Sequence, residues 1–120
     1  CLMALHHMVL QQEIICSIYR VLKPGGVCII REHDCSEDSR TFDGEIALAI
    51  DIQHSMYARV LSNPVEWPTF CSDYYAKYRA RDTWTRMFLS AGFQRVENVR
   101  PDLYRAHGKS NWYWAVYRKK

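Results

Sequence analysis

Two short groups of titratable residues, each at or near the end of an apolar run, carry the clearest chemical signal in this 120-residue sequence. His6-His7 follows residues 1–5, and Glu32-His33-Asp34 follows residues 27–30. Neighbouring imidazoles and carboxylates tune each other's pKa and can transfer protons to or from a bound reactant. Solvated loop residues would give the same pattern, so a structural interpretation stays open beside the chemical one.

The elements that would position these groups form one strand–helix–strand unit. The apolar residues 1–5 predict a strand, and apolar positions on one face of residues 10–22 predict a helix. Gly25-Gly26 is expected to end this helix, because glycine enters left-handed backbone without steric cost. The uniformly apolar residues 27–30 predict a strand covered on both faces. Ligands of open α/β sheets bind at the carboxyl ends of the strands, where both titratable groups would then lie.

A helical insertion is predicted over about residues 36–78. Apolar positions at helical spacing predict a helix over residues 45–61, with Asp43 as its N-cap. Asp51, His54 and Ser55 would share one face of this helix. The stretch that follows is rich in aromatic residues: Trp67, Phe70, Tyr74, Tyr75 and Tyr78. These aromatic side chains either fill a small core or contact a substrate.

The last third of the chain predicts one helix and two strands. Trp84, Met87, Phe88 and Ala91 mark a helix face, with Gly92 just beyond its end. Residues 93–100 predict a strand. The nearly unbroken aromatic and apolar run 112–117 predicts an interior strand.

Composition and charge narrow the class of protein. The five cysteines include no C-x-x-C pair, no apolar run approaches the ~20 residues that span a bilayer, and no signal-peptide pattern is present. We therefore expect reduced thiols, a cytoplasmic location and no membrane contact. Residues 1–76 carry five Lys/Arg and ten Asp/Glu, whereas residues 77–120 carry eleven and three. The basic part is either a solvated surface or a contact for a phosphate-bearing partner.

Ala4-Leu5-His6-His7-Met8 and Leu22-Lys23-Pro24-Gly25-Gly26 resemble the second half of class I S-adenosylmethionine-dependent methyltransferases. The resemblance is specific over residues 4–30 and weaker downstream. It implies an α/β fold, part of a doubly wound, Rossmann-like sheet with a helical insertion after the fifth strand. The seventh strand, residues 112–117, would lie antiparallel between the fifth and the sixth.

The resemblance also implies roles for individual residues. Met3, Ala4, Leu5 and His6 would lie beside the methionine part of the S-adenosylmethionine cofactor. His7, Glu32 and His33 are the candidate catalytic residues. The insertion would form a lid over the acceptor, with these residues on the substrate side: Asp51, His54, Tyr57, Tyr75 and Tyr78. No metal site is expected, because no metal-ligand spacing occurs and Leu5-His6 stand where metal-dependent relatives carry an aspartate.

Two anchoring features of such methyltransferases have no counterpart in the sequence. No G-x-G pattern occurs, and no acidic residue stands where one would bind the cofactor's ribose. We therefore expect the chain to be the carboxyl-terminal half of a methyltransferase domain, completed by an amino-terminal half or by a partner that supplies a strand. The isolated chain should be inactive.

The acceptor is less well specified. Ala4-Leu5-His6-His7 differs at one position from the A-L-H-Y of cap guanine-N7 enzymes, which slightly favours RNA over a small metabolite. The alternative function is a catalytically silent, methyltransferase-like structural or interaction module, since a fold does not establish an activity.

Overall fold

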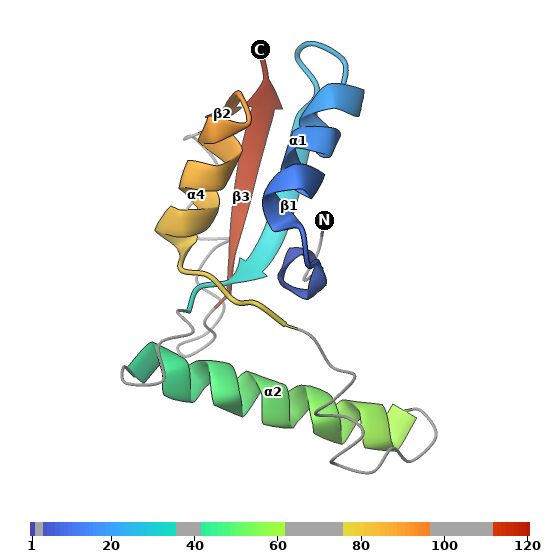
Figure 1. Cartoon of the computed structure of the whole chain (residues 1–120), viewed down its shortest axis with the longest axis vertical. Helices are drawn as coiled ribbons and strands as arrows, with labels where there is room; N and C mark the ends of the chain where they lie inside the picture. The colour runs from blue at the N-terminus through green and yellow to red at the C-terminus, as the bar shows by residue number, and fades with distance from the viewer. Residues whose placement is uncertain (2–3, 36–41, 62–75, 97–111) are drawn as a thin grey trace.

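The computed structural model describes residues 1, 4–35, 42–61, 76–96 and 112–120 of the chain. Their elements are the 3-10 helix η1 (Leu5–His7), the helices α1 (Gln11–Val21), α2 (Phe42–Leu61) and α4 (Arg81–Ser90), and the strands β1 (Val27–His33), β2 (Phe93–Arg95) and β3 (Trp112–Lys119). Figure 1 shows α1 and α4 beside the sheet, and α2 lying across the end where β1 finishes and β3 begins.

The three strands form one antiparallel sheet in the order β1-β3-β2. In register, Val27 pairs with Arg118 and His33 with Trp112, while Phe93 pairs with Lys119. The last strand in sequence is thus the central one, which confirms the prediction for residues 112–117.

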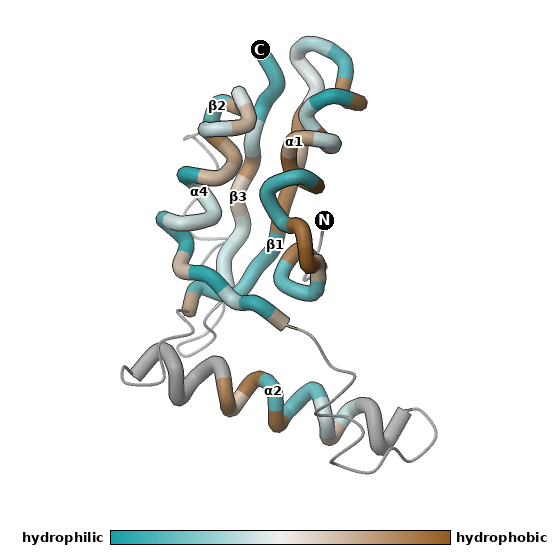
Figure 2. The backbone as a smooth tube through the Cα atoms, in the orientation of Figure 1, coloured by the Kyte–Doolittle hydropathy of each residue, from teal (hydrophilic) through white to brown (hydrophobic). Residues whose placement is uncertain are grey.

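The core lies between one face of the sheet and the two helices α1 and α4. Alternate residues of β1 and β3 point into it, as expected for period-two strands. Phe88 of α4 stacks on Tyr117 with ring centroids 4.1 Å apart, and Ile15 of α1 is fully buried in the same cluster. Figure 2 shows apolar residues in the first part of β1 and in the segment just before α1, and a hydrophilic carboxyl-terminal end of β3.

Burial of β1 on both faces was a wrong prediction. Val27 and Ile29 are 45% and 47% exposed, because both described helices of the core pack on the opposite face. No described helix is long and apolar enough to span a bilayer.

The boundary of the first predicted strand also differs. Cys1 donates to the Ile29 carbonyl (2.9 Å) and accepts from the Arg31 amide (3.0 Å), which is the bonding pattern of a parallel pair around Ile30. Residues 5–7, however, form η1, because their backbone turns back on itself with the His7 amide bonded to the Ala4 carbonyl. Strand-like pairing is therefore seen at residue 1 and has ended before Leu5.

Two of the three predicted helix ends differ from those in the structure. α1 ends at Val21, before the glycines, and Gly25 (φ 76°) instead shapes the turn into β1. Asp43 lies inside α2, which begins at Phe42, so it is not the N-cap. Gly92 (φ 101°) follows the last turn of α4 in left-handed backbone, as predicted.

Candidate functional site

Glu32, the second-last residue of β1, organises the candidate site. Its side chain is 0% exposed. One carboxylate oxygen accepts the backbone amides of Ala4 (3.1 Å) and Leu5 (2.7 Å), and the other pairs with Nδ1 of His6 at 2.5 Å. A buried carboxylate is tolerated only when several donors surround it, and here three donors hold η1 against the end of the strand.

The pairing fixes the chemistry of His6. A carboxylate accepts, so Nδ1 carries the hydrogen and Nε2 keeps its lone pair in the neutral ring. Nε2 is buried and has no hydrogen-bond partner among the described residues. A carboxylate–imidazole pair with a free basic nitrogen is the arrangement of a general base held in one tautomer.

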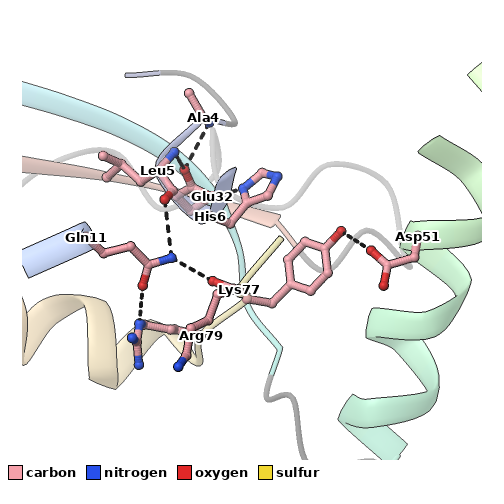
Figure 3. A network of polar contacts seen from close by, with 9 residues as sticks. Ala4, Leu5, His6, Gln11, Glu32, Asp51, Lys77 and Arg79 are labelled. Atoms are coloured by element: carbon pink, nitrogen blue, oxygen red, sulfur yellow. Dashed lines mark hydrogen bonds and ion pairs between the residues drawn. The ribbon is translucent and has the colours of Figure 1, made fainter. Parts of the chain in front are cut away.

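A short segment, residues 76–80, is bonded across η1 (Figure 3). The Lys77 amide donates to the His6 carbonyl at 2.7 Å. Gln11, at the first turn of α1, donates to the Lys77 carbonyl (2.9 Å) and the Leu5 carbonyl (3.3 Å) and accepts from the Arg79 guanidinium. These bonds satisfy the backbone of η1 and place Tyr78 beside it.

Side chains of η1, β1, α2 and segment 76–80 meet in an aromatic group that we call the histidine cluster: His6, His7, His33, His54 and Tyr78. The His6 ring centroid lies 4.1 Å from that of His7, 5.2 Å from His33 and 5.1 Å from Tyr78. His54 of α2 is parallel to His6 at 6.2 Å. Tyr78 also donates to Asp51 of α2 at 2.7 Å, a bond drawn in Figure 3.

Burial keeps two of these imidazoles neutral. The pKa of His33 is lowered to about 4, first by desolvation and then by the neighbouring His6 and His54, against the opposing effect of Glu32. Desolvation likewise lowers the pKa of His54, with His7 and His6 acting in the same direction. A general base works best when its pKa is near the working pH, which argues against His33 as the base.

The structure brings together seven of the residues singled out from the sequence: His6, His7, Glu32, His33, Asp51, His54 and Tyr78. Tyr57 is 54% exposed on α2, and no described contact joins it to the cluster. Met3 and Tyr75 lie outside the described residues. In the described part of the chain, no group of three His, Cys, Asp or Glu side chains is arranged to hold a metal ion.

Sequence reasoning missed the supporting residues Gln11 and Arg79. Gln11 is followed by Gln12 and Glu13, so nothing in the local sequence marks it as a buried polar bridge. Asp34 has a structural role that spacing did not reveal, because its carboxylate accepts the amide of Arg81 (2.7 Å) at the start of α4.

Several solved structures resemble the chain, and three of them are methyltransferases with TM-scores of 0.55–0.57. Human N-acetylserotonin methyltransferase in complex with S-adenosylmethionine is 17% identical, with a TM-score of 0.55 over 98% of this chain and 28% of that protein. An O-methyltransferase family protein from Burkholderia thailandensis is 15% identical (TM-score 0.56; 100% of this chain, 29% of that one). A Thermotoga maritima S-adenosylmethionine-dependent methyltransferase, a possible histamine N-methyltransferase, is 15% identical (TM-score 0.57; 99% and 53%).

The chain has a methyltransferase fold. This confirms, at the level of the fold, the resemblance drawn from residues 4–30, and the chain spans between about a quarter and a half of the length of these three proteins. No protein-family model and no curated protein sequence matches it.

Proposed function

We propose that the chain is the acceptor-side part of an S-adenosylmethionine-dependent methyltransferase in which His6 takes a proton from a small-molecule acceptor. The observation that carries this proposal is the pairing of His6 with the buried Glu32 at the end of β1, within a methyltransferase fold. The catalytic set differs from the one expected from sequence. His6 replaces His7 as the base because Glu32 holds the ring of His6.

Glu32 would act as a positioning residue rather than as an acid or base. Its two oxygens already accept from two amides and one imidazole. When Nε2 of His6 takes the hydrogen of a hydroxyl or amine, the carboxylate stabilises the resulting imidazolium through Nδ1–H. A base held in this way contributes about 10²- to 10⁴-fold to a rate.

The described residues do not by themselves form a cofactor site. The amides of Ala4 and Leu5 are engaged by Glu32, and the carbonyls of Leu5 and His6 by Gln11 and Lys77, so η1 offers a cofactor contact surface but few free hydrogen-bonding groups. S-adenosylmethionine, when bound, supplies an electrophilic methyl group. Its ribose and carboxylate would have to be held by residues other than those the structure describes.

A small acceptor is favoured over RNA for two reasons. Two of the three similar structures are named for small acceptors, N-acetylserotonin and histamine. In addition, the basic run Arg118-Lys119-Lys120 lies at the opposite end of the sheet, since Lys119 bonds Gly25 and Gly26 before β1 while His33 ends it. Seven strand residues at about 3.3 Å each separate the two ends by roughly 20 Å.

The test is a methyl-transfer assay on the longest natural protein that contains this chain. Labelled S-adenosylmethionine would be offered with a panel of small hydroxyl and amine acceptors and, in parallel, with RNA. The His6→Gln variant should lower kcat at least 100-fold, and His7→Gln should lower it less than tenfold. Transfer to RNA alone would overturn the small-acceptor proposal, and a larger effect of His7→Gln would return the base to His7.

A second measurement addresses the silent-module alternative and the role of the isolated chain. Calorimetry of the 120-residue chain with S-adenosylmethionine should show no saturable binding, because the anchoring residues are missing from it. Micromolar binding would contradict this expectation. An unchanged kcat in both histidine variants would favour a module in which these rings serve structure.

A further inference from the structure

Four imidazoles from three elements meet in the histidine cluster. His6 and His7 belong to η1, His33 to β1 and His54 to α2. In five pairs among these four rings, the ring centroids lie 4.1–6.2 Å apart. At these distances a second positive charge is disfavoured by the first.

The cluster lies where α2 meets the rest of the fold. His54 contacts the rings of His6, His7 and His33. One turn earlier, Asp51 accepts from Tyr78, and Ile50 packs against Cys35 and Tyr78. α2 is therefore joined to the body through the same side chains whose charge changes with pH.

The described residues that act on the cluster electrostatically include two carboxylates and one guanidinium. Glu32 faces it from β1, where it accepts from two backbone amides and pairs with His6, and Arg31 of the same strand adds a positive charge. From α2, Asp51 offers one carboxylate, which is shared with Tyr78 of segment 76–80. Protonation of two or more imidazoles would place positive charges within about 4.1–6.2 Å of one another, where they repel.

We propose that the histidine cluster is an acid-sensitive clamp, which holds α2 against η1 and β1 at neutral pH and releases it as the pH falls below about 6. The release would expose the site around His6 without unfolding the core between the sheet, α1 and α4. The proposal concerns the attachment of α2 and does not depend on methyl transfer.

The sign follows from linkage. The pKa of His33 is about 4 when α2 is docked, against about 6.5 in water, so the docked state binds fewer protons. Docking is then fully stabilised above pH 6.5 and is progressively weakened as the pH falls toward 4. Only the part of this shift that α2 causes, through burial and through His54, is lost on release. The docking constant should therefore fall by less than the roughly 30-fold that the full shift would give between pH 7.5 and pH 5. The lowered pKa of His54 acts in the same direction.

Hydrogen exchange with mass spectrometry on the 120-residue chain tests the clamp. Protection factors, corrected for the intrinsic pH dependence of exchange, would be compared for peptides of α2, α1 and α4 between pH 7.5 and pH 5.0. Protection of α2 should fall at least tenfold while that of α1 and α4 changes less than twofold. Constant protection of α2, or an equal loss in all three helices, would overturn the proposal.

Three variants, His33→Gln, His54→Gln and Tyr78→Phe, distinguish titration from simple loss of contact. His33→Gln removes a titrating ring at similar size, and it should reduce the pH dependence of α2 protection at least threefold. Tyr78→Phe removes the bond to Asp51, so it should lower α2 protection by a similar factor at every pH. An unchanged pH dependence in both His33→Gln and His54→Gln would show that the cluster is not the sensor.

Discussion

The core beneath the sheet and the histidine cluster at its end are built on different physical principles. In the core, Phe88, Phe93 and Tyr117 pack ring against ring with no charged group among them. Beside the cluster, the fully buried carboxylate of Glu32 is surrounded by two amides and the imidazole of His6. Apolar burial is non-directional, whereas the cluster depends on a few bonds of defined geometry.

The two regions therefore differ in how they should respond to substitution. A shortened core side chain loses contacts and leaves a cavity, which lowers the stability of the whole fold. A changed cluster residue leaves a buried donor or acceptor without a partner, and the effect is concentrated on η1 and α2. The core stabilises the whole fold, and the cluster fixes the positions of η1 and α2.

The largest loss of stability is expected from Phe88→Ala. Phe88 is fully buried and stacks on Tyr117, so its truncation should cost about 3–5 kcal/mol of unfolding free energy. Urea denaturation followed by circular dichroism measures this loss. Leu89→Ala, on the neighbouring 47%-exposed position of the same helix, is the matched control and should cost less than about 1 kcal/mol. Similar costs at the two positions would contradict the described core.

The core was largely predictable because its signals are periodic. Trp84 and Phe88 stand four residues apart on one helix face, and both are fully buried. The run 112–117 was assigned to an interior strand and lies at the centre of the sheet. Such patterns repeat within a single element, so they can be read without knowing what packs against it.

The cluster was only partly predictable because its bonds join residues far apart in the sequence. His6 and Glu32 were both chosen as site residues, but their pairing spans 26 positions and has no local signature. The contact of Tyr78 with Asp51 joins two segments in the same way. The sequence pattern indicated which residues could form the site. Only the three-dimensional structure shows that Glu32 pairs with His6 rather than with His7.

Glu32→Gln tests the contribution of the buried carboxylate that holds His6. The amide keeps one acceptor oxygen, but it loses the charge that favours Nδ1–H on His6, so the basic nitrogen of that ring is no longer fixed. We expect a cost of about 1.5–3 kcal/mol in stability and, in the complete protein, a kcat at least 100-fold lower. Calorimetric unfolding and the methyl-transfer assay measure the two effects. A variant with unchanged kcat would show that the pairing is purely structural.

Substitution of two glycines distinguishes the cost of backbone strain from the cost of a steric contact. Gly25 and Gly92 both have positive φ, but an added Cβ meets nothing near Gly25 and lies 3.0 Å from the Tyr19 ring at Gly92. Gly25→Ala should cost about 1 kcal/mol from the backbone alone, and Gly92→Ala about 1–2 kcal/mol more. Thermal denaturation of both variants measures the difference. Equal costs would mean that the Tyr19 ring moves aside freely.

Tyr78→Phe should have the smallest effect, and it tests whether the cluster is a separate cooperative unit. The variant keeps the buried ring beside His6 and His33 and removes the hydrogen bond from its hydroxyl to Asp51. One such bond contributes about 0.5–1.5 kcal/mol. If α2 opens independently, hydrogen exchange within α2 should quicken by roughly 2- to 12-fold while global unfolding in urea barely changes. If the loss instead appears in full in the urea midpoint and equally in the exchange of α1 and α4, then α2 unfolds with the core. The molecule would then have one cooperative unit, because the directional bonds of the cluster and the apolar packing of the core would break together.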